Sequence, residues 1–247
     1  MKLLFAAILI QFHVFNATFN CPGHANENLD SLTSHVSLVK ILNLDISASD
    51  GTKLKATYYS SDKPGPGMLL LHECDMDRKS WQSLATSLAN NGIHVLTFDY
   101  RGYGETAASG NLYEHLASDV DSALANLISQ PGVDKEHIAA GGASCGVYNS
   151  MQLAMRNDKI KALFLLTGPI PEKGVEYIKT HPDMPIFAIE NGDEVAAVKE
   201  LDAIIKNSKN PASTMKAYPN GAHGVRIFEK HPEIIPTVTN WLVQVLK

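Results

Sequence analysis

The chain has 247 residues and a formal net charge of −5, and 45% of its residues are hydrophobic. This length and hydrophobic content suit one large domain with a buried core, and the mildly acidic charge argues against a general nucleic-acid-binding surface. Seventeen Gly and 12 Pro are too few and too scattered for a fibrous protein, and three Cys cannot build a disulfide scaffold.

The first 25 residues have the features of a secretory signal. A basic start precedes an apolar run from Leu3 to Ile10, and small residues before Ala25 offer a cleavage site, with Ala17 as the second choice. The run is shorter than the ~20 residues of a membrane-spanning helix. A buried N-terminal helix is the alternative interpretation. The signal predicts a secreted or periplasmic protein, without a membrane span in its mature form, whose domain covers residues 26–247.

After the signal, patterns typical of strands alternate with patterns typical of helices. Strands are expected at 36–46, 54–59, 68–71, 93–98, 138–141, 160–166, 186–189 and 214–218. Helices are expected at 81–89, 116–128, 147–155, 175–179, 195–205 and 234–246. This alternation predicts an α/β fold in which helices cover both faces of a mostly parallel sheet. Since no repeat or linker divides the chain, we expect one domain.

A candidate nucleophile lies in the sequence Gly-Ala-Ser-Cys-Gly, residues 142–146, between an expected strand and an expected helix. In this context G-x-S-x-G predicts a sharp strand-to-helix turn that exposes the serine hydroxyl, and small residues at both ends avoid clashes. The following helix N-terminus also favours negative charge nearby. The motif therefore indicates Ser144 as a nucleophile, with a chance glycine turn as the alternative.

A nucleophilic serine needs a general base and an acid that orients the base, in the chain order Ser, acid, His. His223 lies between Gly221 and Gly224, after an expected strand and before the last helix. Asp193 follows the expected strand 186–189, so both side chains lie at carboxyl ends of strands, where open α/β sheets place their sites. We expect His223 to be the base and Asp193 the acid. Candidates that compete with Asp193 are Glu190, Glu194 and, more distantly, Asp183.

With these motifs the mature sequence resembles the α/β-hydrolase superfamily over nearly its whole length. It is most similar to small esterases without a lid and to dienelactone-hydrolase-like members. Two further segments carry the resemblance: Leu-Leu-His-Glu-Cys at 70–74, where many members read His-Gly-x, and Phe-Asp-Tyr-Arg-Gly-Tyr-Gly-Glu at 98–105. Asp99 and Arg101 in the second segment are expected to brace the loop beneath the site.

The resemblance implies the α/β-hydrolase fold, with an eight-stranded, mainly parallel sheet. It also implies a triad of Ser144, Asp193 and His223 and an oxyanion hole formed by the backbone N–H groups of Cys74 and Cys145. The implied function is a secreted serine hydrolase that cleaves a small carboxylic ester, lactone or related acyl compound through an acyl-enzyme. Its partner would be this small-molecule substrate, with no nucleic acid, metal or other cofactor involved.

Besides the serine hydrolase, two alternative functions stay open at this point, which makes three in all. Dienelactone hydrolases proper use a cysteine nucleophile, which would be Cys145 here, although the spacing favours Ser144. The third alternative is an α/β-hydrolase fold that binds a ligand without catalysis. Substrate identity and oligomeric state do not follow from the sequence.

The segment around 72–77 leaves three further questions. Glu73 stands where many members have Gly, which predicts a less open and more acidic loop. Cys74 and Cys145 either form a disulfide or are two small buried residues. His, Glu, Cys and Asp side chains in this segment resemble metal ligands, but successive residues rarely point at one metal. Finally, only 19 residues separate the strands expected at 160–166 and 186–189, too few for a lid domain.

Overall fold

The computed structural model describes residues 39–247, apart from the side chains of residues 196 and 197. The expected signal segment at residues 1–25, both candidate cleavage sites and the first residues of the strand expected at 36–46 lie outside the described residues. The part of the expected domain that the structure describes therefore begins at Val39.

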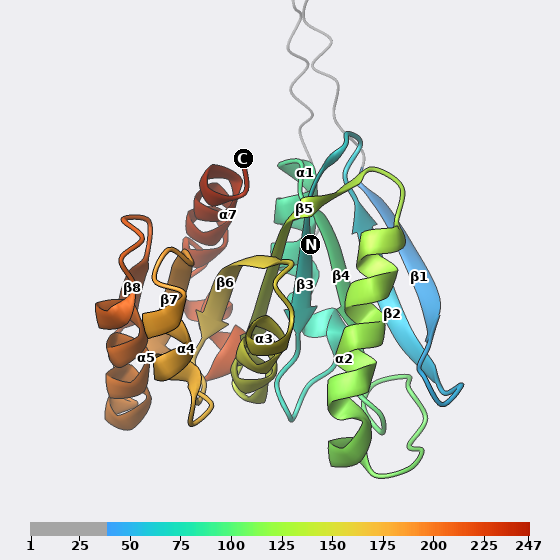
Figure 1. Ribbon diagram of the computed structural model, residues 1–247, viewed down its shortest axis with the longest axis horizontal. Coiled ribbons are helices and arrows are strands. Elements are labelled where there is room, and N and C mark those ends of the chain that lie inside the picture. Colours follow the sequence, from blue (N-terminus) through green and yellow to red (C-terminus); the bar gives the residue numbers. More distant parts are fainter. Residues whose placement is uncertain (1–38) are drawn as a thin grey trace, which may run out of the picture. The chain divides into compact units, whose positions relative to one another are not determined.

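The strands of residues 39–247 form one eight-stranded sheet in the order β1-β2-β4-β3-β5-β6-β7-β8 (Figure 1). Their bounds are β1 Lys40–Ser47, β2 Lys53–Ser60, β3 Gly65–Leu71, β4 His94–Phe98, β5 Val133–Ala143, β6 Ile160–Leu166, β7 Ile186–Asn191 and β8 Thr214–Tyr218. Strand β2 pairs antiparallel with β1 and β4, and all other neighbours pair in parallel. The expectation of a mostly parallel eight-stranded sheet is confirmed.

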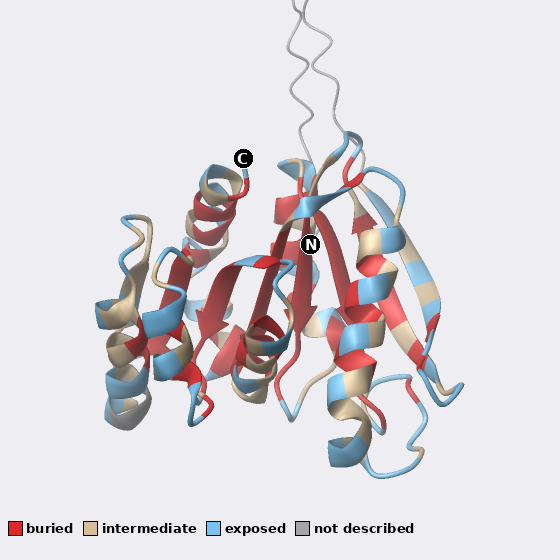
Figure 2. Ribbon diagram, viewed as in Figure 1, coloured by how far each residue is buried: buried red, intermediate tan, exposed pale blue. Residues whose placement is uncertain are grey.

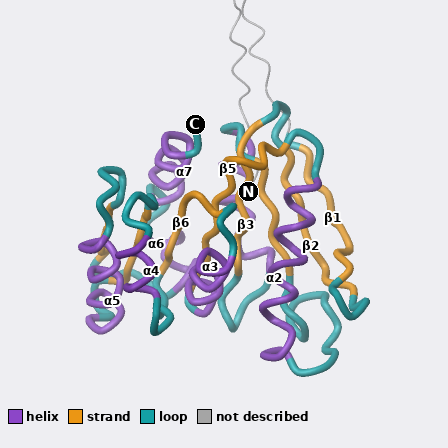
Figure 3. The backbone as a smooth tube through the Cα atoms, viewed as in Figure 1, coloured by secondary structure: helices purple, strands orange, loops and turns teal. Residues whose placement is uncertain are grey.

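Helices cover both faces of this sheet (Figure 3). Their bounds are α1 Gln82–Asn90, α2 Leu112–Ser129, α3 Cys145–Arg156, α4 Gly174–Thr180, α5 Val195–Asn207, α6 Ile227–Lys230 and α7 Ile234–Val245, with short 3₁₀ turns η1 Arg78–Trp81 and η2 Gly224–Arg226. Helices α2 to α5 contribute to the hydrophobic cluster on one face, and α1, α6 and α7 contribute to the cluster on the other.

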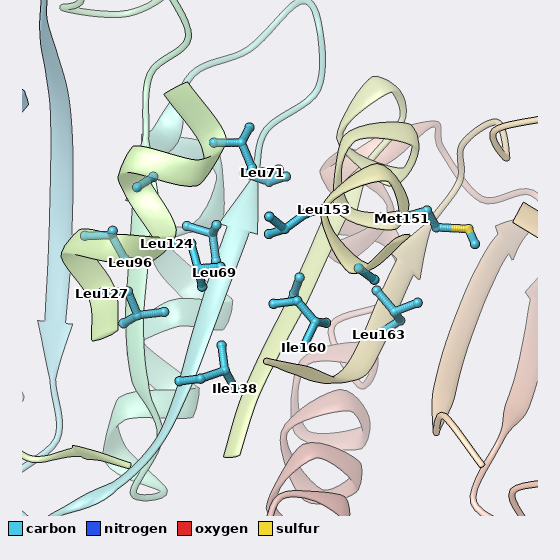
Figure 4. Packing of buried hydrophobic residues seen from close by; sticks show 14 of the residues in the cluster. Leu69, Leu71, Leu96, Leu124, Leu127, Ile138, Met151, Leu153, Ile160 and Leu163 are labelled. Carbon is cyan, nitrogen blue, oxygen red and sulfur yellow. The ribbon is translucent and has the colours of Figure 1, made fainter. Parts of the chain in front are cut away.

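Strand β3 explains why two separate cores form. Its side chains alternate between faces, so Leu69 and Leu71 join the α2–α5 cluster while Met68 and Leu70 join the α1–α7 cluster. All four are fully buried, and Figure 2 shows the same burial along the central strands. Figure 4 shows Leu69 and Leu71 among side chains from neighbouring strands and helices. An apolar run without polar alternation is typical of such a doubly covered strand.

Most element bounds agree with the sequence, and the differences have local causes. Strands β6 and β8 have the expected bounds. Strand β5 begins earlier than expected because the polar residues near Val133 pair with the start of β3. The short η2 and α6 were not expected. Between β6 and β7 only α4 intervenes, so the fold is compact, without a lid domain. Among the described helices none has the length and apolarity to cross a membrane.

Candidate active site

Ser144 occupies the sharp turn that the sequence predicts between β5 and α3. Its backbone has φ 51° and ψ −121°, a strained conformation for a residue with a side chain. A Cβ on Gly142 would lie 2.1 Å from the carbonyl oxygen of Gly146, and one on Gly146 would lie 2.2 Å from that of Leu71. Both positions therefore require glycine, and the turn presses the start of α3 against the end of β3.

His223 pairs with Glu194. The Nδ1 atom of His223 lies 3.1 Å from Oε2 and 3.2 Å from Oε1 of Glu194, and both side chains are partly exposed. Since a carboxylate only accepts hydrogen bonds, Nδ1 is the donor in this pair, and in the neutral ring Nε2 then keeps the lone pair. This is the tautomer that a general base requires.

The carboxylate that pairs with His223 is that of Glu194 and not that of Asp193, which the sequence favours. Asp193 is exposed and, among the hydrogen bonds of residues 39–247, its carboxylate makes none with His223. The cause is the turn after β7: Asn191 Oδ1 accepts from the Asp193 backbone N–H at 3.3 Å, and Asn191 Nδ2 donates to Glu194 Oε1 at 3.3 Å. Asp193 thus lies on the outer side of the turn, and Glu194 is aimed at the imidazole. The sequence had named Glu194 only as a competitor.

The segment from Leu166, the last residue of β6, to Gly168 brings the serine and histidine loops together. Ser144 donates its backbone N–H to the Leu166 carbonyl at 3.0 Å, and a Cβ on Gly168 would lie 2.2 Å from the Ser144 carbonyl oxygen. On the other side, Gly224 donates its N–H to Thr167 Oγ1 at 2.6 Å. Within the described residues no hydrogen bond joins Ser144 to His223, and such catalytic bonds commonly tighten only when substrate binds.

Backbone strain is concentrated around this segment. Among the described residues, the non-glycine positions with positive φ are Ser144, Thr167 and Asn220, and each lies in a loop at a strand end of the site. Thr167 is fully buried with φ 46°, unfavourable for a β-branched residue. Its hydroxyl bond to the Gly224 N–H offsets that strain by fixing the loop of His223. The sequence did not indicate this role of Thr167.

Cys74 and Cys145 form a disulfide beside Ser144, with their Cα atoms 5.9 Å apart. This answers the question that the sequence left open. In the described part of the chain, neither backbone N–H donates to a protein acceptor, so both remain free to bind a substrate oxygen. The two donors expected for the oxyanion hole therefore belong to residues that are covalently linked.

Glu73 is fully buried against the histidine loop. A Cβ on Gly224, whose φ is +62°, would lie 1.6 Å from Glu73 Oε2, so this position also requires glycine. Arg226 Nη1 lies 3.7 Å from Glu73 Oε1. Burial and nearby Asp75 raise the pKa of Glu73, and Arg226 opposes this shift. The acidic group that the sequence indicated in this loop thus lies on the His223 side.

Another buried carboxyl group, that of Glu190, belongs to the penultimate residue of β7 and lies close to Glu194. Its side chain has no exposed surface. Burial, with the charge of Glu194 adding to it, raises the pKa of Glu190 to about 8. At neutral pH Glu190 is therefore mainly protonated.

The loop after β4 is braced by buried ion pairs, as the sequence predicts. Arg101 donates to both carboxylate oxygens of Asp119, at 2.6 and 2.8 Å, and to both of Asp50, at 2.7 and 3.0 Å. Asp99 accepts from Arg78 and from the backbone N–H of Glu105. Among the described residues, neither Asp99 nor Arg101 forms a hydrogen bond with the Ser144 turn. These pairs hold the loop beneath the site.

His72 links the loop after β3 to the loop after β4 through both of its ring nitrogens. Its Nδ1 lies 2.7 Å from the Glu73 carbonyl oxygen, and its Nε2 accepts the Tyr100 backbone N–H at 3.0 Å. Burial lowers the pKa of His72, which keeps the ring neutral. Asp75 turns away to pair with Arg226 at 2.8 Å. In residues 39–247 no three His, Cys, Asp or Glu side chains are arranged to hold a metal ion.

Residues 66–190, just over half of the chain, match the family model described as alpha/beta hydrolase fold. The chain belongs to the α/β-hydrolase fold family. This region includes the Ser144 turn and the loop after β3 that contains Cys74, while Glu194 and His223 lie beyond it.

Two curated relatives are similar to this α/β-hydrolase chain over part of their length. An uncharacterized protein of Mycobacterium tuberculosis is 34% identical over 143 residues, which cover 57% of this chain and 50% of the relative. A thiohydrolase of Aspergillus aculeatus is 28% identical over 203 residues, covering 78% and 63%. The chain thus spans between half and two thirds of the length of these relatives.

Solved structures share the fold at low sequence identity. An esterase of Pyrococcus furiosus superposes with a TM-score of 0.68 at 17% identity, covering 85% of this chain and 92% of that one. A dienelactone hydrolase of Anabaena variabilis gives 0.69 at 16% identity, covering 85% and 99%. The α/β-hydrolase core therefore agrees with that of known enzymes over nearly their full lengths.

Proposed function

We propose that the protein is a secreted or periplasmic serine hydrolase that cleaves a small carboxylic ester, lactone or related acyl compound. The observation that carries this proposal is the strained Ser144 turn, which lies beside two backbone N–H groups without a protein acceptor. The segment 166–168 contacts both this turn and the loop of His223. In our proposal Ser144, His223 and Glu194 form the triad, and the backbone N–H groups of Cys74 and Cys145 form the oxyanion hole.

Acylation starts when Ser144 Oγ attacks the carbonyl carbon of the ester while His223 Nε2 takes the hydroxyl proton. The carbonyl oxygen becomes an oxyanion, which the N–H groups of Cys74 and Cys145 stabilise. When this intermediate collapses, the ester C–O bond breaks and the leaving oxygen takes the proton from His223. Glu194 stabilises the imidazolium that forms between these two steps. In a lactone the leaving hydroxyl stays attached to the acyl group.

Deacylation repeats these steps with water. His223 takes a proton from a water molecule, whose oxygen attacks the acyl carbon, and Ser144 Oγ leaves and regains a proton from the imidazole. The net reaction converts ester and water into carboxylic acid and alcohol. No metal or redox cofactor takes part in either half.

Two further observations support the proposal. The Cys74–Cys145 disulfide agrees with the oxidising compartment that the N-terminal signal predicts. The named relatives include a thiohydrolase, and the similar structures include an esterase.

The test is labelling by a fluorophosphonate probe together with hydrolysis of short p-nitrophenyl esters. Wild type should react with both, and Ser144→Ala should lose both. Ser129→Ala provides the control, because this serine is exposed at the end of α2. Labelling that survives in Ser144→Ala would overturn the assignment of the nucleophile.

The same experiment tests the two other functions. A cysteine nucleophile predicts that Ser144→Ala stays active and that iodoacetamide inhibits, but the disulfide leaves Cys145 without a free thiol. A binding protein without catalysis predicts that wild type is neither labelled nor active. No observation in the described residues favours either alternative.

A further inference from the structure

A cavity of about 560 Å³ lies between α2 and α3 and reaches the disulfide. Side chains of Leu112, Leu116 and Val120 line it from α2, and those of Tyr148 and Gln152 line it from α3. At one end it is bounded by Cys74 and Cys145, the residues of the proposed oxyanion hole. We call this cavity the α2–α3 groove. Its volume lies in the range of small-molecule sites.

The position of the groove relative to the triad decides which part of a substrate it receives. The leaving group must reach His223, which gives it a proton, and His223 does not line the groove. The carbonyl oxygen lies against the N–H groups of Cys74 and Cys145, where the groove begins. The acyl part, on the other side of the carbonyl carbon, is therefore the part that extends between α2 and α3.

Charge and polarity of the lining decide the kind of acyl group. The cation in the groove, Arg156, is already engaged: its side chain pairs with Asp121 at 2.8 Å and donates to the Ala117 carbonyl at 3.1 Å. The Tyr100 hydroxyl accepts from Asn149. A carboxylate on the acyl chain would have to compete with Asp121 for Arg156, whereas an apolar chain displaces only water.

The rim of the groove is aromatic. Tyr113 of α2 and Tyr148 of α3 are 84% and 42% exposed, and they belong to the few large hydrophobic side chains that the described residues leave exposed. Both line the groove from opposite helices. Exposed aromatic rings that border an apolar cavity are typical of a surface that contacts ligand.

We propose that the α2–α3 groove is the acyl-binding site and that the enzyme selects uncharged, apolar acyl groups of medium length. This inference rests on the proposed function, since it assigns the substrate class of the same site. The disulfide forms the wall of the groove nearest to the scissile bond, and the two tyrosines flank its opening.

The test compares p-nitrophenyl esters that share one leaving group. The octanoate ester should exceed the acetate ester in kcat/KM by at least about tenfold, because each buried methylene contributes to binding of the transition state. The hemisuberate ester has the same chain length as octanoate but ends in a carboxylate, and its kcat/KM should lie at least about tenfold below that of octanoate.

Two variants of α2 test whether the preference for octanoate over acetate arises in the α2–α3 groove. Ala117 lines the groove on the exposed side of α2, so Ala117→Trp fills the groove and should lower the octanoate-to-acetate ratio about tenfold or more. Ala125 is also exposed on α2 but outside the groove, so Ala125→Trp is the matched control and should keep the wild-type ratio. An unchanged ratio in Ala117→Trp, or hemisuberate turned over as fast as octanoate, would overturn the proposal.

A binding measurement separates this inference from the proposed function. Calorimetry with Ser144→Ala and methyl octanoate should detect binding that the added Ala117→Trp weakens about tenfold or more. If no ester is hydrolysed but this binding is found, the acyl site stands and the hydrolase proposal fails. If esters are hydrolysed but this binding does not depend on residue 117, the acyl-site proposal fails alone.

Discussion

Cys74 and Cys145 are joined by a disulfide although 71 residues separate them in the sequence. Cys74 lies in the connection between β3 and η1, and Cys145 is the first residue of α3. Both residues carry a proposed oxyanion donor, so the covalent bond limits how far one donor can move from the other. Catalysis by an oxyanion hole depends on such fixed geometry, because donors that must reorganise stabilise the transition state less.

Reduction of the disulfide is expected to lower both stability and activity. A crosslink over this chain length stabilises a fold by roughly 2–4 kcal/mol through the unfolded state. We expect the reduced protein to unfold at lower urea concentration and to react more slowly with fluorophosphonate at concentrations where it stays folded. The control is the Cys74→Ala/Cys145→Ala double variant, in which reductant should have no effect. Equal labelling rates of oxidised and reduced protein would show that the bond does not position the donors.

Glu194 rather than Asp193 is expected to orient His223. Glu194→Gln removes the carboxylate that holds the Nδ1 proton, and the analogous change in a serine protease lowers kcat by about 10⁴. Asp193→Asn is the matched control on the adjacent residue and should keep nearly full activity, since its side chain is exposed. The measurement is kcat for a short ester in both variants. The opposite pattern would restore Asp193 as the acid.

The buried Glu190 is expected to make the fold less stable at alkaline pH. Its pKa in the folded chain is about 8, above the ordinary value of 4.5, so the folded state holds this proton more tightly than the unfolded state. Stability contributed by the protonated group is complete below the ordinary pKa and is lost as pH rises through about 8.

Urea unfolding of Glu190→Gln at different pH values checks this expectation. The variant should be less sensitive to alkaline pH than wild type, with the difference growing by about 1.4 kcal/mol for each pH unit between the two pKa values. Glu136→Gln, at an exposed position, should follow wild type. A wild-type protein equally stable at neutral and alkaline pH would contradict a buried, protonated Glu190.

Arg101→Met is expected to destabilise the fold strongly. The substitution leaves the fully buried Asp119 without its partner, and breaking a buried pair in this way costs about 3–5 kcal/mol. Arg156→Met is the control, because its pair with Asp121 is partly exposed and such pairs contribute about 1 kcal/mol or less. Unfolding free energies of the two variants should differ accordingly. A loss in Arg101→Met as small as in Arg156→Met would mean that the loop does not depend on this pair.

The sequence predicts those parts of the fold that depend on local apolar patterns. Strand β6 is an apolar run that breaks at both ends, and its bounds agree to the residue. Strand β5 is longer than its apolar part, because the polar residues after Val133 are ordered by pairing with β3, a contact over a long sequence distance. Short elements such as α6 have too few residues for a recognisable period.

In the candidate site, too, features with a local cause are predictable from the sequence, and features that depend on distant contacts are not. Gly142 and Gly146 signal the Ser144 turn, since only a missing side chain permits their close approaches. The choice between Asp193 and Glu194 depends on how the Asn191 side chain shapes one turn, which no pattern encodes. The disulfide depends on the approach of two loops. Thr167 has a positive φ, which β-branched residues rarely adopt. The sequence therefore gives no reason to expect this conformation there.

The short connection between β6 and β7 also bears on the fate of the acyl-enzyme. Among residues 39–247 only α4 lies there, and the His223 side chain is 43% exposed. In the proposed mechanism, solvent water would reach His223 directly and would outnumber any competing alcohol. The proposed acyl-enzyme is therefore expected to be hydrolysed rather than to transfer its acyl group to a second acceptor.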